Sequence, residues 1–533
     1  MDANQRKHFG FLVLIAIALF TLYALPNAAA SKNLAMVQVF SADESLPLPT
    51  VLRMVAPSGS LEQTAKNFIF YGYYPYGLVY FAWSAAVVYP LQWLGLSGNT
   101  AWVMLVLRQM VSVLPMLAAL MFLVFLQDGF RTYRSYILFV FLAVIPAVVQ
   151  NNLWWHPDGL VTLFAVLTLF FLVRDRLRFG AGFYIAALAC GLAIGTKLVG
   201  VFFFLAVAVY LLLGIVQKKA SWPRLLRAGG LFILVMAATY LLTNPYLFFA
   251  SARAEFIKTM IGQGASLSTG YGVVYAKGII ASWPIVREFF GEAVFILAAI
   301  ACTLWGILRG TRRILYLLIF AWFIPLSLTV FFFSHFKFQY WLPAILPVIS
   351  CVIVLFPEKP LETLGRPAAR WFVLPGFLLL IAQFGMFSRA DLASYSSTLF
   401  RERENPAVSF YTAVAEALTP IGDDPAHIYY DPNMYMPPTR KWTAATTFEL
   451  LSYQYIQEQK FEVVLLQQSR IRDYLNPNAV GIDPARFAEN QTFYRQADVD
   501  ELTGFHLILS TEFGKAFVRE DIYRKYFESS GLP

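Results

Sequence analysis

Long apolar runs separated by short basic clusters make up most of this chain. The run from Phe9 to Leu25 is followed by others of similar length, and most are long enough to cross the hydrocarbon core of a bilayer as one helix. Further spans are expected at 101–126, 135–150, 158–173, 181–196, 198–216, 228–249, 291–309, 314–333, 338–356 and 371–388. Together with a retained first helix, the pattern predicts a polytopic α-helical membrane protein with about 11 transmembrane helices.

The segment from Tyr76 to Gly95 is apolar, aromatic and about as long as a span. If it crossed the membrane, all later basic clusters would lie outside, against the positive-inside rule. These clusters are Arg131/Arg134, Arg174/Arg176/Arg178, Lys218/Lys219/Arg224/Arg227, Arg309/Arg312/Arg313 and Lys359/Arg366/Arg370. We therefore expect an in-plane or re-entrant helix within an outer loop at 27–100, with the N-terminus inside.

The composition changes from about Asp391 onward, where charges and prolines become more frequent. Short β-like runs such as HIYY, FEVVLL and FHLIL alternate with helical patterns, one of them at 443–459. We predict a transmembrane module at 1–390 and a soluble α/β domain at 391–533, which this topology places outside.

The overall composition agrees with a membrane protein. Of the 533 residues, 58% are hydrophobic and 17% aromatic, and the mean hydropathy is +0.59, which is more apolar surface than a soluble core could bury. The net charge of +9 lies in clusters between spans, so it indicates topology and not nucleic-acid binding. The three cysteines lie within apolar runs and predict neither disulfides nor a thiolate metal site.

Residues capable of chemistry collect on the outer side of this topology. They come from the stretches SADESLP, WWHPDG, GTK and SHFKFQY and from an expected outer loop at 250–287. The candidates are Asp43, Glu44, His156, Asp158, Lys197, Arg253, His335, Lys337 and Tyr340. A carboxylate can take a proton from an acceptor hydroxyl, while fixed cations neutralise a phosphate as it leaves. The set therefore suits transfer of a group from a lipid phosphate.

Most of these residues also have a structural explanation. The two loop carboxylates fit a solvated loop or a helix N-terminus, and Asp158 fits a helix cap. His156 fits an interfacial aromatic belt, and Lys337 fits a lysine whose side chain extends to the membrane surface. Lys197 is harder to explain in this way, because an ionisable residue between two apolar runs is functional by default.

No nucleotide or metal motif is present in the sequence. The Gly-rich stretch at 262–272 lacks the GK[ST] of a P-loop and is expected to be a flexible outer loop. Neither HExxH nor a related spacing specifies a metal.

Several motifs follow one another in a specific order between about residues 9 and 390. They are DE after the first helix, YYPYGLVY, LRQMVS, HPDGLVTLF, GLAIGTKLVG, TNPYLFF and FKFQYWLPAILP. In this order they resemble the GT-C superfamily, in the bacterial branch similar to protein O-mannosyltransferases and the aminoarabinose transferase of lipid A. The resemblance implies an inverting transfer of a sugar from a polyprenyl-phosphate carrier to a glycan, lipid or protein hydroxyl. The reaction would take place at the outer face of a bacterial inner membrane, without a nucleotide.

The resemblance also implies roles for the candidate residues. Asp43 would be the general base, with Glu44 and Asp158 as supporting carboxylates, and Lys197 and Lys337 would contact the phosphate. The remaining expected substrate-binding residues are His156, Arg253, His335 and Tyr340. No tightly held cofactor is implied, and a divalent metal stays open.

Two other functions compete with this interpretation. A lipid-linked oligosaccharide flippase would also carry buried charges, but alternating access needs a site near the midplane that is reachable from both faces. The one-sided polar residues and the large outer domain favour an enzyme. A phosphoethanolamine transferase would show a Thr/His/Asp metal site in its soluble domain, which this sequence lacks, and an O-antigen ligase is a further alternative.

Overall fold

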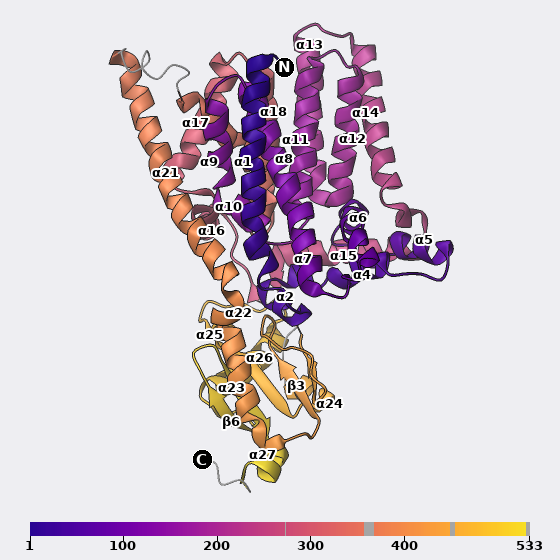
Figure 1. The fold of residues 1–533 in the computed structure, drawn as a ribbon, viewed down its shortest axis with the longest axis vertical. Helices are drawn as coiled ribbons and strands as arrows, with labels where there is room; N and C mark the ends of the chain where they lie inside the picture. Colours follow the sequence, from indigo (N-terminus) through magenta and orange to yellow (C-terminus); the bar gives the residue numbers. More distant parts are fainter. Residues whose placement is uncertain (272, 357–366, 448–452, 529–533) are drawn as a thin grey trace. The chain divides into compact units, whose positions relative to one another are not determined.

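A computed structural model describes residues 1–271, 273–356, 367–447 and 453–528 (Figure 1). The chain forms two compact units, which we call the helical unit and the sheet unit. The helical unit comprises Met1–Ala28, Pro47–Gly262 and Lys277–Thr398. The sheet unit comprises Ala29–Leu46, Gln263–Ala276 and Leu399–Pro533. Two segments that lie far apart in the sequence thus belong with the C-terminal domain.

The helical unit is built almost wholly from helices. Its α-helices are α1 (Ala3–Ala28), α4 (Leu48–Val55), α5 (Leu61–Ile69), α6 (Leu78–Trp93), α7 (Thr100–Leu107), α8 (Leu114–Asp128), α9 (Arg134–Ala143), α10 (Pro146–Asn152), α11 (Asp158–Asp175), α12 (Ala181–Thr196), α13 (Leu205–Val216), α14 (Trp222–Leu242), α16 (Ile279–Phe290), α17 (Ala293–Arg309), α18 (Arg313–Leu328) and α19 (Phe338–Ser350). Helices α15 (Ala250–Thr269) and α21 (Pro367–Leu399) begin in this unit and end in the sheet unit. Shorter elements are the π-helices η1 (Arg108–Val113) and η4 (Thr329–Phe333) and the 3₁₀ helices η2 (Leu198–Phe204), η3 (Pro245–Phe248) and η5 (Cys351–Leu355).

The prediction of a polytopic helical membrane protein is confirmed. Among the described residues, seven helices are long and apolar enough to span a membrane, or nine if each of two bent pairs forms one span. The spans expected at 158–173 and 181–196 are also helices, namely α11, which contains three charged residues, and α12, which has 16 residues. In Figure 1, α12, α13 and α14 run side by side, whereas α6 is seen nearly end-on across their direction.

Two spans are bent at residues whose chemistry explains the bend. Helices α9 and α10 meet at 66°, where Pro146 starts the second helix. Helices α16 and α17 meet at 81° around Gly291, whose φ of +99° favours glycine. A Cβ atom at Gly291 would also lie 2.6 Å from the Gln383 side chain. The loop expected at 250–287 is wrong, since most of that stretch forms α15 and α16.

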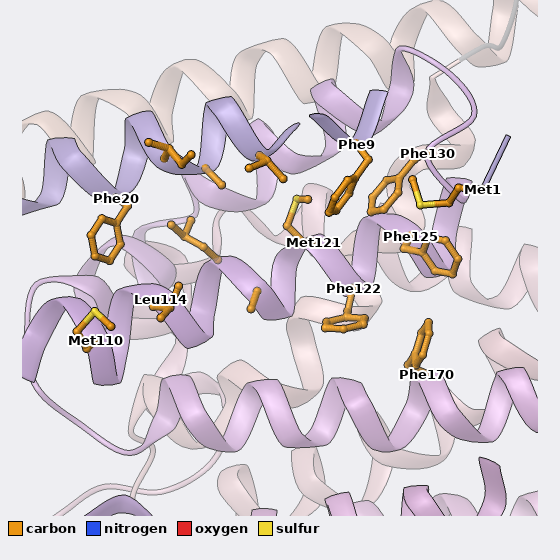
Figure 2. Close-up of a pocket in the computed structure, with 15 residues that line it drawn as sticks. Met1, Phe9, Phe20, Met110, Leu114, Met121, Phe122, Phe125, Phe130 and Phe170 are labelled. Atoms are coloured by element: carbon orange, nitrogen blue, oxygen red, sulfur yellow. The ribbon is translucent and has the colours of Figure 1, made fainter. Parts of the chain in front are cut away.

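The groove in Figure 2 lies between α1, α8 and α11 and has a volume of about 640 Å³. Phe9 and Phe20 come from α1, Phe122 and Phe125 from α8, and Phe170 from α11. Its lining side chains are all apolar, as expected for a surface that faces lipid acyl chains. None of them belongs to the set of candidate site residues.

The topology predicts where an impermeant reagent can reach the chain. Single cysteines at the exposed residues Arg131 and Thr311 should stay unlabelled from outside, because the positive-inside rule predicts that both lie on the inner side. A cysteine at the exposed Asp423 should be labelled. The native cysteines Cys190, Cys302 and Cys351 are buried and give little background. Outside labelling at Arg131 or Thr311 would contradict the prediction that the segment from Tyr76 to Gly95 does not cross the membrane.

The sheet unit is an α/β domain. Its helices are α2 (Leu34–Phe40), α3 (Ala42–Ser45), α22 (Arg401–Glu404), α23 (Pro406–Ala417), α24 (Tyr453–Gln459), α25 (Gln468–Leu475), α26 (Pro484–Asp498) and α27 (Glu520–Tyr526), with the 3₁₀ turn η6 (Thr419–Ile421). Its strands are β1 (Gly270–Tyr271), β2 (Val273–Val274), β3 (Ala426–Tyr430), β4 (Trp442–Ala445), β5 (Val463–Gln467), β6 (Phe505–Ser510) and β7 (Gly514–Arg519). The main sheet has the order β4-β3-β5-β7-β6. Strands β4, β3 and β5 are parallel to one another, and β7 pairs antiparallel with both β5 and β6.

Both faces of this sheet are covered, which explains its nearly continuous apolar strands. Along β5, Val464 packs with α25 and α26 on one face, and Val463 packs with α23 on the other. The three β-like runs named from the sequence are β3, β5 and β6. The helix expected at 443–459 is correct only for α24, because Trp442–Ala445 forms β4. Residues 448–452 of that prediction lie outside the described residues.

The segment that carries Asp43 packs on the sheet domain. Met36 of α2 is buried in one cluster with Ala407 of α23 and with Tyr435. The Asn33 side chain caps α2 and donates a 3.2 Å hydrogen bond to the Tyr435 hydroxyl. The sheet unit therefore includes the four-residue helix α3, whose first turn contains Asp43 and Glu44.

Candidate functional site

The turn between α10 and α11 presents the first part of the site. Helix α10 ends at Asn152, and Pro157 stands at the N-cap of α11, so that Asp158 is the first helical residue. The Asp158 carboxylate bonds to side chains and not to free backbone N–H groups of the helix. The simple capping explanation is therefore not what the structure shows.

Asp158 lies between two cationic or potentially cationic groups. Its Oδ1 accepts a 2.8 Å hydrogen bond from Nζ of Lys197, and its Oδ2 is in ion-pair contact with Nδ1 of His156. The side chains of Asp158, His156 and Lys197 are 0%, 2% and 9% exposed. Such burial is tolerated because each charge has a partner, and little water is left to screen them.

Lys197 occupies the break that the sequence predicts between two apolar runs. Helix α12 ends at Thr196, Lys197 itself is extended, and η2 begins at Leu198. The ammonium nitrogen lies 4.4 Å from the ring centroid of Tyr340 and 5.9 Å from that of Tyr76. These distances are typical of cation–π contacts, which together with Asp158 fix the position of the charge.

Tyr76 extends this group of polar side chains in contact. Its hydroxyl oxygen is 2.8 Å from Nε2 of His156. The neighbouring Gly77 donates its N–H to the carbonyl of Thr196 at 2.9 Å, and a Cβ atom there would lie 1.9 Å from the Gly195 carbonyl oxygen. Only glycine permits this approach, which brings the Tyr76 segment against the end of α12.

Trp154 forms one wall of the site. Its ring stacks on His156 with centroids 4.4 Å apart and an interplanar angle of 7°. The buried indole N–H of Trp154 has no hydrogen-bond partner among the described residues. On the backbone side, Ser112 Oγ in η1 accepts a 3.2 Å hydrogen bond from the His156 N–H. An unpaired buried donor is uncommon and indicates a place where a ligand oxygen would be favourable.

The other predicted cations differ in their surroundings. Lys337 stands at the N-cap of α19, and both it and His335 are partly buried. Burial and the nearby Lys337 charge lower the pKa of His335. Arg253 is exposed in α15 and donates to the Leu247 carbonyl at 2.9 Å, so nothing in its geometry indicates substrate binding.

The loop carboxylates differ from each other in exposure. Glu44 is fully buried, whereas Asp43 is partly exposed in the same turn of α3. Both belong to the sheet unit, while the Lys197 group belongs to the helical unit. Their participation in one site remains a prediction. Among the described residues, no group of three or more His, Cys, Asp or Glu side chains could hold a metal ion.

Sequence reasoning missed four residues of this region, namely Tyr76, Trp154, Ser112 and the fully buried Arg108 of η1. Tyr76 and Arg108 lie in the motifs YYPYGLVY and LRQMVS, and Trp154 directly precedes HPDG. Arg108 donates to the Asn27 carbonyl at 3.1 Å. A polar residue inside an apolar run was the available signal for Arg108.

No family model and no curated protein sequence matches the chain. Among solved structures, ArnT from Cupriavidus metallidurans bound to undecaprenyl phosphate is similar, with a TM-score of 0.55 and 12% identity over 96% of this chain and 97% of that one. The same protein in the apo state gives a TM-score of 0.53 and 12% identity over 95% and 97%. AglB from Archaeoglobus fulgidus, in complex with an inhibitory peptide and a dolichol-phosphate, gives 0.48 and 12% over 99% and 81%. The likeness to ArnT confirms the expected GT-C-like fold, a multi-pass helical module followed by a small α/β domain.

Proposed function

We propose that the protein is an inverting glycosyltransferase that moves a sugar from a polyprenyl-phosphate carrier to an acceptor hydroxyl at the outer face of the membrane. The proposal rests mainly on the position of Lys197, a buried cation that Asp158 and Tyr340 hold at a helix break. It lies in a fold shared with ArnT, which has been seen with undecaprenyl phosphate. A lysine ammonium is a point charge that donates charge-assisted hydrogen bonds, which suits it to binding a phosphate oxygen.

Asp158 is better described as a positioning residue than as a catalytic one. Its side chain is fully buried, and its two oxygens face His156 and Lys197. Neighbouring cations stabilise the charged form of a carboxylate, which makes it a weaker base toward an acceptor hydroxyl. Asp43 therefore remains the proposed general base, because it is partly exposed in a polar segment, whereas Glu44 is fully buried.

An apolar cavity of about 400 Å³ could take part of the polyprenyl tail. It lies between α16, α17, α18 and α19, and Trp341 in its wall directly follows Tyr340 of the site. Phe338 of α19 also stacks on Phe289 of α16, and its ring centroid lies 6.2 Å from that of the Trp154 ring. A lipid phosphate at Lys197 would thus have apolar surface beside it.

The flippase alternative has less support. The residues around Lys197 come from the turn before α11, the end of α12 and the start of α19. A site built at helix ends lies near one surface, whereas alternating access needs a site near the midplane. The proposal places this surface, the active site and the C-terminal domain on the periplasmic or extracellular side of a bacterial inner membrane.

Replacing Trp154 by Phe should weaken donor binding about 3- to 10-fold while the protein stays folded. Phe keeps an aromatic ring on His156 but removes the unpaired N–H, and a neutral hydrogen bond contributes about 0.5 to 1.5 kcal/mol. Binding of a polyprenyl phosphate to purified protein would measure the change. Trp442→Phe in β4 is the matched control and should bind as the wild type does. Equal affinities for wild type and Trp154→Phe would contradict a ligand contact at this N–H.

The reaction class can be tested in cells by mass spectrometry of lipid extracts from a strain that lacks the gene. We expect a polyprenyl-phosphate sugar to accumulate together with a glycan, lipid or protein that has lost a sugar. The accumulated species identify both the sugar and the acceptor. An unchanged polyprenyl-phosphate pool and unchanged envelope glycans would contradict the proposal.

A further inference from the structure

His156 is held so that only one of its ring nitrogens is able to exchange a proton. Nδ1 is in ion-pair contact with Asp158, and the negative charge of that carboxylate favours a proton on the nitrogen next to it, so Nδ1 keeps its proton. Nε2, which is 2.8 Å from the Tyr76 hydroxyl oxygen, is therefore the nitrogen that gains or loses one. The protonation state of His156 therefore determines the direction of its hydrogen bond with Tyr76.

The Tyr76 hydroxyl changes its hydrogen-bond direction with that state. Beside a neutral imidazole, the hydroxyl donates its hydrogen to Nε2. Beside an imidazolium, Nε2–H donates to the hydroxyl oxygen, and the hydroxyl hydrogen becomes available to another acceptor. Because Nζ of Lys197 is 5.9 Å from the Tyr76 ring centroid, a phosphate bound to Lys197 would lie beside this ring.

The charges around His156 make this exchange sensitive to the ligand. Among the described residues, the charged groups in contact with His156 or its carboxylate partner are Asp158 and, on the other oxygen of that carboxylate, Lys197. Tyr76, Trp154 and Ser112 also contact His156 and are neutral. With a neutral imidazole, the charges of His156, Asp158 and Lys197 sum to zero. With an imidazolium, they sum to one positive charge. Burial of these side chains leaves the added charge weakly screened.

We propose that His156 takes up a proton when the lipid phosphate leaves the sugar, and that the Tyr76 hydroxyl then turns to donate to that phosphate. The inference rests on the proposed function. The bond between the sugar carbon and the phosphate oxygen breaks with its electron pair going to the oxygen. The acceptor oxygen forms the new bond to the carbon, and its proton passes to the base and on to water. The phosphodiester thereby becomes a phosphate monoester, whose second pKa is about 6, so it carries one more negative charge at neutral pH. His156 takes one proton from water to match this added charge.

The inference can be tested by calorimetry on the full-length protein in lipid nanodiscs. The probes are undecaprenyl phosphate and its methyl phosphodiester, titrated at one near-neutral pH in two buffers of different ionisation enthalpy. Binding of the monoester should take up more protons than binding of the diester, by up to about one. His156→Gln should remove this difference. Tyr76→Phe should weaken monoester binding about tenfold and change diester binding less than about twofold.

A matched control is His506→Gln, because His506 is a half-exposed histidine that is also paired with a carboxylate, Glu520. It should behave as the wild type. Proton uptake that persists in His156→Gln, or equal uptake for both lipids in the wild type, would overturn the inference while leaving the proposed function standing. If His156→Gln does not fold, Tyr76→Phe decides, and equal weakening for both lipids counts against the inference. Absence of binding to either lipid would overturn both proposals.

Discussion

Asp43→Asn is expected to lower the turnover of sugar transfer by about 10²- to 10⁴-fold while leaving donor binding and folding near the wild type. Asparagine keeps the size and most hydrogen bonding of aspartate but lacks the basic lone pair that accepts the acceptor proton. Of the two adjacent carboxylates, only Asp43 is partly exposed, so the structure favours it over Glu44 as the group that reaches a substrate. Initial rates of polyprenyl phosphate release from the sugar donor would measure the effect.

Three further variants help to interpret the Asp43 result. Asp423→Asn is the matched control, since Asp423 is an exposed aspartate of the same unit, and it should keep full turnover. Glu44→Gln should be milder than Asp43→Asn, although burial of Glu44 gives it a part in the stability of the segment. A nearly silent Asp43→Asn with an inactive Glu44→Gln would assign the base to Glu44. Full activity in the double variant Asp43→Asn/Glu44→Gln would show that neither carboxylate takes part in the chemistry.

Lys197→Met is expected to weaken binding of the polyprenyl-phosphate donor by about 10- to 150-fold. This range corresponds to a charge-assisted contact of roughly 1.5 to 3 kcal/mol. Lys197→Arg should recover part of the affinity, because a planar fork replaces a point charge held between Asp158 and the Tyr340 ring. Direct binding of undecaprenyl phosphate to purified protein would measure both variants.

The loss of Lys197 also leaves Asp158 with one partner fewer, so stability must be separated from binding. The double variant Lys197→Met/Asp158→Asn removes both charges of the pair and should regain thermal stability without regaining affinity. Lys515→Met is the matched control, because Lys515 is also a buried lysine, 2.6 Å from Asp500, but lies in the sheet unit. It should lower stability and leave affinity unchanged. Wild-type affinity in Lys197→Met would return that lysine to a structural role.

The membrane-spanning helices of this protein could be predicted closely because each of them requires a long apolar run in the sequence. A span must satisfy its own backbone and bury apolar side chains over its whole length, so its limits follow from the apolar run. The helix break at Lys197 was also predictable, since Gly195, Thr196 and Lys197 interrupt a run too long for one span. Helix α15 was missed because it contains glycines and is only weakly apolar.

The grouping of distant segments could not be predicted in the same way. Residues 29–46 join the sheet unit through a few small contacts, such as Met36 with Ala407, which leave no periodic pattern. The same limit applies to the site. His156 and Asp158 are two residues apart across a proline, and their proximity was visible, but Tyr76 reaches His156 over 80 residues. Its aromatic neighbourhood instead suggested a membrane-interface belt.

We propose that this protein consumes a polyprenyl-phosphate sugar and does not merely move it across the membrane. The most direct measurement reconstitutes the purified protein in liposomes made with lipids from the strain that lacks the gene, and adds envelope material from that strain as the acceptor. Mass spectrometry should show the polyprenyl-phosphate sugar converted to polyprenyl phosphate by the wild type and not by Asp43→Asn. A donor that stays intact and only changes its side of the membrane would contradict the account and support the flippase.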